Sequence, residues 1–157
     1  MVRIPFFKQK NIHFCAPAIV QMIFAAHGIK MSQTKIAKEM KTPLTMHEGT
    51  KPERMVHMLA KHGFGVQAGQ RKKISDITHA LNQNVIVVVC YTDPFDQYGH
   101  YVIVKSCTKS RIVFIDPDRY MGRFSLPAKK FESLWKDPLF TKTVGWAAFV
   151  TAPKKLR

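Results

Sequence analysis

The sequence is poor in the patterns that hold disulfides, metals or nucleotides. It has only 3 cysteines, widely spaced and odd in number, which argues against a disulfide framework. It has no CxxC pair and no HExxH motif, so its 7 histidines do not indicate a zinc site. A glycine-rich phosphate loop and an aromatic–basic RNA-binding signature are also missing. We therefore expect a protein that works without a metal or an organic cofactor.

Long hydrophobic segments are missing as well. No apolar run approaches the roughly 20 residues that a transmembrane helix needs. The run at residues 85–91 is far shorter and is interpreted as a buried strand. Residues 1–8 lack the apolar core of a signal peptide. The sequence therefore predicts a protein without a transmembrane segment, located in the cytoplasm.

Acidic residues are scarce. Asp and Glu total 10 against 25 Lys and Arg, which gives a formal net charge of +15. The simplest interpretation is a solvated basic surface. A field of this sign also attracts nucleic acid, anionic lipid or an acidic peptide. A catalytically silent domain that binds an anionic partner is therefore one hypothesis for function.

The chain does contain enough apolar material for a core. Hydrophobic residues make up 46% of its 157 residues, and a chain of this length buries roughly 70% of its unfolded surface on folding. The sequence has no internal repeat, low-complexity tract or linker. Residues 1–157 are therefore expected to form a single domain, whose oligomeric state the sequence leaves open.

Helical patterns dominate the first half of the chain and strand patterns the second. Helices are expected at about residues 15–27, 32–40, 50–62, 75–81 and 127–135, and strands at 64–67, 85–91, 100–106, 111–116 and 146–151. The third helix is predicted to open with a capping box, in which Thr50 bonds forward and Glu53 reaches back. This order indicates an α+β domain, with N-terminal helices packed on a C-terminal antiparallel sheet.

Cys15 carries the strongest functional signal, because it stands at or beside the start of the first helix. Backbone N–H groups point out of a helix N-terminus, and the dipole there favours an anion such as a nucleophilic thiolate. A free cysteine in an apolar segment is more often a core residue, and we interpret Cys90 and Cys107 as core or strand-end residues. His100 and Asp116, far downstream, could supply the base and the orienting carboxylate of a papain-type site.

The spacing of two strands explains how His100 and Asp116 could meet. The strand that begins at His100 and the strand that ends at Asp116 form a predicted hairpin. Pairing Ser106 with Ser110 puts His100 opposite Asp116, and a register shift of one residue makes them diagonal. Opposite residues have β-carbons roughly 4.5–5.5 Å apart, within reach of a hydrogen bond. Asp116 could instead belong only to a turn. Two alternative carboxylates are expected in a loop at the rim of the cleft, Asp93 and Asp96.

Four short motifs, in order along nearly the whole chain, resemble those of the bacteriocin-processing peptidase family, the cysteine peptidases that remove double-glycine leader peptides. The matching positions are Gln9 with Cys15, Pro17 and Ala18; Gly49-Thr50-Lys51-Pro52; Gly99-His100 before an apolar strand; and Asp116-Pro117. The family usually has Gly directly after the nucleophile, where this chain has Ala16, and an acidic or polar residue before it, where this chain has Phe14. The resemblance implies a stand-alone member with a papain-like fold.

The resemblance also implies roles for four residues. Cys15 would be the nucleophile, His100 the general base and acid, and Asp116 the group that orients the imidazole. Gln9 would donate a side-chain N–H to the oxyanion hole. The implied reaction is cleavage of a peptide or amide bond through a thioester, on a peptide substrate of the leader type. Papain-like relatives also transfer acyl groups to amines or thiols, so acyl transfer by the same triad is an alternative.

Overall fold

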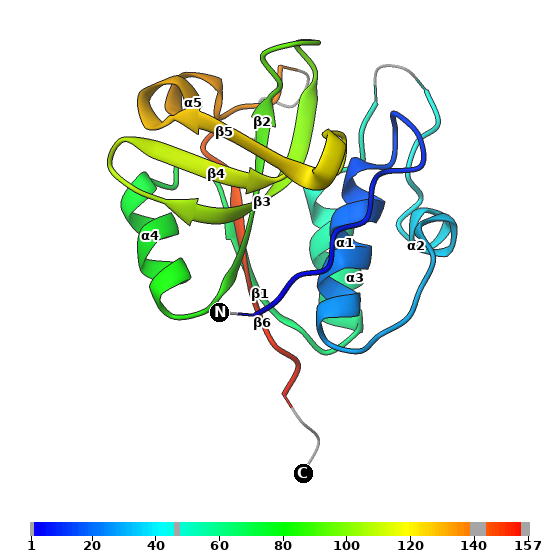
Figure 1. Ribbon diagram of the computed structural model, residues 1–157. Helices are drawn as coiled ribbons and strands as arrows, with labels where there is room; N and C mark the ends of the chain where they lie inside the picture. Colours follow the sequence, from blue (N-terminus) through cyan, green and yellow to red (C-terminus); the bar gives the residue numbers. More distant parts are fainter. Residues whose placement is uncertain (1, 46–47, 139–143, 155–157) are drawn as a thin grey trace.

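The structure is a computed structural model that describes residues 2–45, 48–138 and 144–154. Within these residues, six strands form one antiparallel sheet with the order β1-β6-β2-β3-β4-β5 (Figure 1). The strands are β1 (Gly65–Gly69), β2 (Ile86–Thr92), β3 (Gly99–Cys107), β4 (Arg111–Ile115), β5 (Arg123–Pro127) and β6 (Ala147–Thr151). The C-terminal strand β6 lies between β1 and β2, so the sheet draws together distant parts of the chain.

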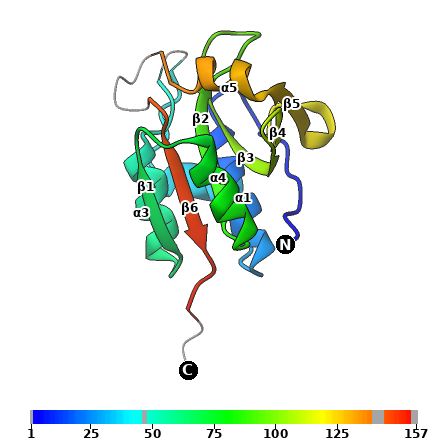
Figure 2. The same cartoon turned by 90° about the vertical axis from the view of Figure 1, so that its left-hand side faces the viewer.

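Helices cover both faces of this sheet. The described helices are α1 (Cys15–Ala26), α2 (Gln33–Glu39), α3 (Pro52–Lys61), α4 (Ile74–Asn82) and α5 (Ala128–Leu134), with a 3-10 turn η1 (Tyr120–Gly122) before β5. The helices α1, α2 and α3 lie on one side of the sheet, and α4 and α5 on the other (Figure 1). Figure 2 looks from the α4 side and shows α1 behind the sheet. The predicted α+β class with N-terminal helices packed on an antiparallel sheet is confirmed.

The central strands are apolar on both faces because each face meets a helix layer. Alternate residues of β2 point to opposite cores: Val88 and Cys90 pack with α1 and α3, whereas Val87, Val89 and Tyr91 pack with α4 and α5. Every residue of β2 is buried. A strand covered on both sides is expected to show such a continuous apolar run. The interpretation of residues 85–91 as a buried strand is therefore confirmed, with a one-residue shift.

Helix α1 is the central element of the larger core. Its sequence is apolar on most sides, and nine of its 12 residues are buried, from Cys15 to Phe24. The helix ends at Ala26, where His27 caps it and places Nδ1 3.0 Å from the carbonyl oxygen of Ile23. Gly28 follows with φ of +79°, a left-handed conformation that glycine adopts without strain. Packing of α1 against the sheet fixes the position of its first residue, Cys15.

Two local predictions are wrong. Strand β5 was not predicted; it follows a kinked turn at Met121, and its five residues mix polar and apolar side chains. The capping box at Thr50 does not form, because Lys51 is the N-cap of α3 and makes no side-chain cap. Thr50 is buried instead: its hydroxyl lies 2.9 Å from that of Thr42, and its carbonyl accepts a hydrogen bond from the Tyr101 hydroxyl at 2.8 Å. Tertiary contacts therefore replaced the local cap.

None of the helices in the described part of the chain is both long enough and apolar enough to span a bilayer.

Candidate active site

Cys15 is the first residue of α1 and is 8% exposed. The N-cap, Phe14, offers no side-chain hydrogen bond to the first turn. Backbone N–H groups of this turn therefore point toward the space in front of the thiol, and the helix dipole favours negative charge there. Pro17 occupies a first-turn position where a missing N–H costs little. The local sequence thus presents a thiol at a positive helix end, as the sequence analysis expected.

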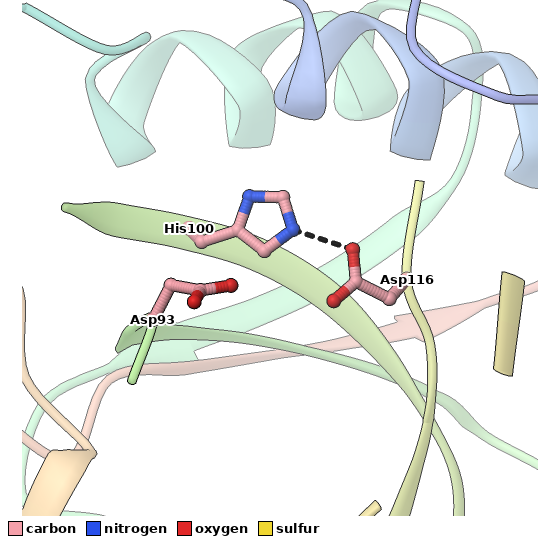
Figure 3. Close-up of side chains that lie close together, drawn as sticks. All are labelled: Asp93, His100 and Asp116. Carbon is pink, nitrogen blue, oxygen red and sulfur yellow. Dashed lines mark hydrogen bonds and ion pairs between the residues drawn. The ribbon is translucent and has the colours of Figure 1, made fainter. Parts of the chain in front are cut away.

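His100 approaches the same region from the sheet. It is the second residue of β3, lies opposite Tyr91 of β2 and is 8% exposed. Its Nε2 lies 2.6 Å from Oδ1 of Asp116, a fully buried carboxylate one residue beyond the end of β4 (Figure 3). The structure therefore joins two of the predicted site residues by a short, charge-assisted hydrogen bond.

The strand register that produces this contact differs from the predicted one. Ile103 pairs with Ile115, and the register shifts at an irregularity between Val104 and Ser106. Ser106 faces Val113, so the predicted pairing of Ser106 with Ser110 is wrong. A β-bulge inserts an extra residue and turns the strand. Continued by one residue, the pairing of Ile103 with Ile115 puts Asp116 opposite Val102. His100 is two residues away on the same strand, so it and Asp116 lie diagonally, just past the end of the paired segment.

Asp116 is held by more than His100. Its Oδ1 also accepts the backbone N–H of Asp118 at 2.9 Å, and its Oδ2 lies 3.5 Å from Nε of Arg119. Arg119 donates in turn to Asp93. The guanidinium lies between two aromatic rings, 4.6 Å from the ring centroid of Phe95 and 4.9 Å from that of Phe124. Ring faces attract a cation placed in this way, so the positive charge is fixed beside the carboxylate.

These contacts set the charge states of the pair. Burial by itself disfavours a charged imidazole, but hydrogen bonds with Asp116 and Cys15 outweigh it and raise the pKa of His100 well above its usual value. Burial also acts to raise the pKa of Asp116, yet its hydrogen bond and ion pair with His100 lower that pKa overall, helped by the N–H of Asp118 and by Arg119. Both directions favour an imidazolium beside a carboxylate.

The second ring nitrogen of His100 is hydrogen-bonded with Cys15. Nε2 is engaged by Asp116, which leaves Nδ1 for the hydrogen bond with Cys15 that contributes to the raised pKa of His100. Figure 3 shows this second nitrogen turned toward the helices. A histidine held by a carboxylate at one nitrogen presents the other to its nucleophile in a defined orientation.

Gln9 lies in the same cavity, in the extended segment before α1. It is 9% exposed, and its backbone N–H donates to the carbonyl of Pro117 at 2.9 Å. This bond ties the N-terminal segment to the loop that carries Asp116. The side-chain amide donates through Nε2 to the carbonyl of Asn11 at 3.0 Å. An amide nitrogen carries two hydrogens, so one N–H remains for a substrate oxygen.

A buried glutamine in α2 fixes the backbone on both sides of Gln9. The Gln33 side chain is 2% exposed; it donates to the carbonyl of Lys8 at 2.8 Å and accepts from the N–H of Lys10 at 3.0 Å. It also donates to Oε1 of Gln21 at 3.0 Å. Gln33 was not anticipated, because nothing in its local sequence distinguishes it from a surface glutamine at the start of a helix.

The cavity that collects these groups has a volume of about 170 Å³ and is lined by Cys15, His100 and Gln9 among others. Asp96 lines it too, as predicted for a residue at the rim. Asp93 lies in the same loop, as predicted, but not at the rim, because it is 2% exposed, does not line the cavity and pairs with Arg119. Burial raises the pKa of Asp93, and the N–H of Phe95 and Arg119 offset this only in part.

The remaining two cysteines lie where the sequence analysis placed them. Cys90 is fully buried in the middle of β2, and its thiol donates to Oδ2 of Asp137 at 3.7 Å. Burial, together with nearby Asp137 and Cys15, raises the pKa of Cys90. Cys107 ends β3 and is partly exposed, and burial raises its pKa as well. Neither location favours a nucleophilic thiolate.

One group of side chains has the donor atoms that a metal would need. Ligand atoms of Asp93, His100 and Asp116 lie within 4.8 Å of one another (Figure 3). Arg119 is paired with both carboxylates, however, so its positive charge already occupies the position that opposes theirs. Two buried carboxylates around a guanidinium are electrostatically satisfied without a cation. The cluster is therefore better explained as support for His100.

Comparison with known proteins identifies the family of this chain. Residues 3–143 match the sequence profile of the Peptidase C39 family. The chain belongs to this family. The resemblance to bacteriocin-processing peptidases that the motifs indicated is thereby confirmed. No curated protein matches the chain in sequence.

Solved structures share the C39 fold over almost the whole chain. The peptidase domain of Streptococcus ComA, a bifunctional ABC transporter, has a TM-score of 0.75 at 19% identity, and the match covers 97% of this chain and 100% of that one. A C39-like peptidase from Bacillus anthracis gives 0.77 at 14% identity, covering 98% of each chain. A double glycine motif protease from an AMS/PCAT transporter, in complex with its leader peptide, gives 0.72 at 12% identity, covering 98% and 94%. At these identities the likeness establishes the fold.

Proposed function

We propose that this C39-family chain is a cysteine peptidase in which Cys15 is the nucleophile, His100 the base and acid, and Asp116 the group that orients the imidazole. The observation that supports this most strongly is the cavity in which the thiol at a helix start meets an imidazole hydrogen-bonded to a buried carboxylate. These three groups come from three separate elements, and papain-type catalysis needs that combination.

The proposed reaction starts with the Cys15 thiolate, which attacks the carbonyl carbon of a peptide bond. The resulting oxyanion is stabilised by the backbone N–H of Cys15 and by the second amide N–H of Gln9. His100 gives its proton to the leaving amine, which departs and leaves a thioester on Cys15. His100 then takes a proton from water, whose oxygen attacks the thioester carbonyl. The products are a carboxylic acid and the free thiol.

Leader-type peptides are the proposed substrate class. The double glycine motif protease whose structure contains a leader peptide has the same fold over 98% of this chain. Ala16 follows Cys15, is fully buried and belongs to the apolar core that α1 forms with the sheet. Its side chain therefore packs into the core, and the methyl group that replaces the usual glycine hydrogen does not narrow the approach of a substrate backbone.

Substitution of the nucleophile tests the proposal. Cys15→Ala is expected to abolish turnover of a peptide substrate while unfolding at a similar temperature, because alanine suits the first turn of a helix. Cys107→Ala, on the partly exposed end of β3, is the matched control and should retain activity. An iodoacetamide-type reagent should label Cys15 faster than Cys107 or the buried Cys90. Wild-type turnover by Cys15→Ala would disprove the assignment.

Addition of an amine acceptor tests whether the thioester goes to water. A peptide library digested with and without a primary amine should give free carboxylates in both cases if the enzyme hydrolyses its substrate. Amide products that dominate at modest amine concentration would show acyl transfer instead. Both outcomes require the same acyl-enzyme on Cys15, so this experiment sharpens the reaction class without depending on the identity of the triad.

A further inference from the structure

The cavity at Cys15 has the opposite charge to the rest of the protein. The chain carries 25 Lys and Arg against 10 Asp and Glu. Four of those 10 acidic residues line this one cavity: Glu48, Asp96, Asp118 and Asp137. Among the described residues that line it, none is a lysine or an arginine, and the positive charge at His100 is already paired with Asp116. The scarce negative charge of the molecule is therefore concentrated around the candidate nucleophile.

The four carboxylates come from separate segments that the fold brings together. Glu48 precedes α3, Asp96 lies in the turn between β2 and β3, Asp118 follows β4, and Asp137 follows α5. Local sequence does not link them, so their convergence is a property of the tertiary structure. A cleft lined by charges of one sign focuses the electrostatic field and concentrates ligands of the other sign.

Three of these carboxylates keep acceptor capacity toward the cavity. Within the described residues, Glu48, Asp96 and Asp118 form no ion pair with a lysine or arginine. Asp96 accepts the backbone N–H of Tyr98 through Oδ1 at 2.9 Å, which leaves its second oxygen. Asp137 packs against the strand that carries His100: its carboxylate occupies the space that a β-carbon at Gly99 would need. The negative charges thus border the position where a substrate would lie.

An independent feature of the cavity also points to a ligand with N–H groups. Gln9 is 9% exposed, and its Oε1 is a buried acceptor without a hydrogen-bond partner among the described residues. Buried acceptors are rarely left unpaired unless a ligand or water completes them. Ile12 and Tyr98, both exposed, add apolar surface to the same cavity. Apolar walls with convergent acceptors suit a peptide that carries a long, cationic side chain.

We propose that this cleft selects peptides with a lysine or arginine side chain close to the bond that is cleaved. This inference rests on the proposed peptidase function and names its substrate class. The carboxylates would accept hydrogen bonds from the ammonium or guanidinium group, and charge-assisted bonds of this kind are stronger than neutral ones. The basic remainder of the surface would then repel such a substrate except at the cleft, which orients its approach.

Charged thiol reagents test the cleft without requiring turnover. In a Cys107→Ala background, a cationic methanethiosulfonate reagent should modify Cys15 faster than an anionic one of similar size, by a ratio larger than that measured for a free thiol in solution. Asp96→Asn combined with Asp118→Asn should reduce this ratio. Glu132→Gln, an exposed acidic residue of α5 outside the cavity, should leave it unchanged. Equal ratios in the wild type and the double variant would overturn the proposal.

Peptide substrates give the second test. Peptides that differ only in lysine, norleucine or glutamate at each position around the scissile bond should differ in kcat/KM by roughly tenfold or more at one position, with lysine fastest. The preference should weaken in the double variant and at high salt, because salt screens exposed charges. A preference for norleucine or glutamate at every position would overturn the proposal.

The peptidase function and the preference for basic residues can be disproved separately. If Cys15 is modified rapidly and peptides are cleaved, but charge has no effect, the peptidase stands and the basic specificity is wrong. If Cys15 is unreactive toward every reagent and Cys15→Ala retains turnover, the proposed function itself is wrong. A cationic reagent preference together with slow cleavage of glutamate peptides would support both.

Discussion

The two walls of the candidate active site are held in place by different forces. On the helix wall, Cys15 belongs to α1, whose buried residues pack against the sheet through apolar contacts. On the sheet wall, His100 is held by a chain of charged groups that runs through Asp116 and Arg119 to Asp93. The candidate nucleophile is therefore held by apolar packing, and the candidate base by interactions between charged groups. Close packing responds to changes in volume, whereas a buried charged network responds to the loss of one partner.

The comparison extends to the N-terminal segment, which joins the two walls. Its residue Gln9 bonds to the sheet-side loop through Pro117 and is held from the helix side by Gln33. A polar group buried between two elements must find its partners across both. This segment therefore connects the apolar wall to the charged wall by hydrogen bonds. It should be sensitive both to changes in side-chain volume and to the loss of a polar partner.

Asp116→Asn should remove the carboxylate that holds His100 on the sheet wall. It should produce the largest loss of kcat/KM among the variants described below. An amide at this position no longer stabilises the imidazolium or fixes its tautomer, and a comparable change in a serine protease triad lowers kcat by about 10⁴-fold. Alkylation of Cys15 at neutral pH should slow as well. Measurements of kcat/KM and of alkylation rate test this. Turnover within a few-fold of wild type would mean that packing alone is enough to hold His100.

Gln9→Ala should come next, because it removes one oxyanion donor and leaves the nucleophile and base in place. The expected loss in kcat is about 100- to 1,000-fold, as for other donors of this kind, with little change in KM. Gln9→Glu should be at least as harmful, since a carboxylate repels the developing negative charge. Steady-state kinetics and alkylation of Cys15 separate the roles: alkylation should persist in Gln9→Ala. Near-normal kcat in both variants would exclude Gln9 from the site.

Gln33→Leu should have a smaller effect on rate and a measurable effect on stability. It leaves the Lys8 carbonyl and the Lys10 N–H without their partner on Gln33. A buried polar group left unsatisfied costs about 1–3 kcal/mol, and because both lysines are exposed and water can reach their backbone, the loss should lie at or below the lower end of that range. Because Gln9 itself remains, kcat should fall less than in Gln9→Ala. Gln21→Leu is the matched control, since it removes a partner of Gln33 and spares both backbone bonds. Urea unfolding and kcat measurements should both show a larger loss in Gln33→Leu than in Gln21→Leu. Equal losses in the two variants would contradict the role of Gln33 in positioning Gln9.

Arg119→Gln should change the pH dependence of stability more than it changes kcat at neutral pH. Arg119 helps to lower the pKa of Asp116, so its removal should raise the pKa of that carboxyl; at Asp93, whose pKa burial already raises, the same removal should raise the pKa further. A carboxylate with a lowered folded-state pKa stabilises the protein above its unfolded-state pKa, and this stabilisation is lost as pH falls through the folded-state pKa. The acid limb of stability, measured by unfolding at a series of pH values, should therefore move to higher pH in the variant.

A matched arginine and a conservative change complete this test. Arg111→Gln removes an exposed guanidinium that donates to the Ser125 hydroxyl at 2.8 Å, so its acid limb should coincide with that of the wild type. Arg119→Lys keeps the charge but loses the planar group between two rings and should restore the profile in part. Identical acid limbs in Arg119→Gln and Arg111→Gln would show that Arg119 does not act on the triad through charge.

Some of these groups were predictable from sequence and others were not. Cys15 at a helix start could be identified because helix periodicity and terminal signals are local. The burial of Asp93 and the position of Gln33 beside Gln9 could not be predicted, because the sequence does not distinguish a buried polar residue from an exposed one. Arg119 follows the predicted Asp116 by three residues, yet only the fold shows that its side chain turns back toward that carboxylate.

By itself, the sequence determined the local elements and the order of the site residues. The apolar run of β2, the buried helix α1 and the positions of Cys15 and His100 within their elements follow from periodicity, which depends on a few neighbouring residues. The tertiary structure alone decided the strand register at the irregularity after Val104, the strand β5, and the gathering of four carboxylates around one cavity in a basic protein. Those features depend on contacts between distant segments, whose free energy is realised only when the sheet and both helix layers close together.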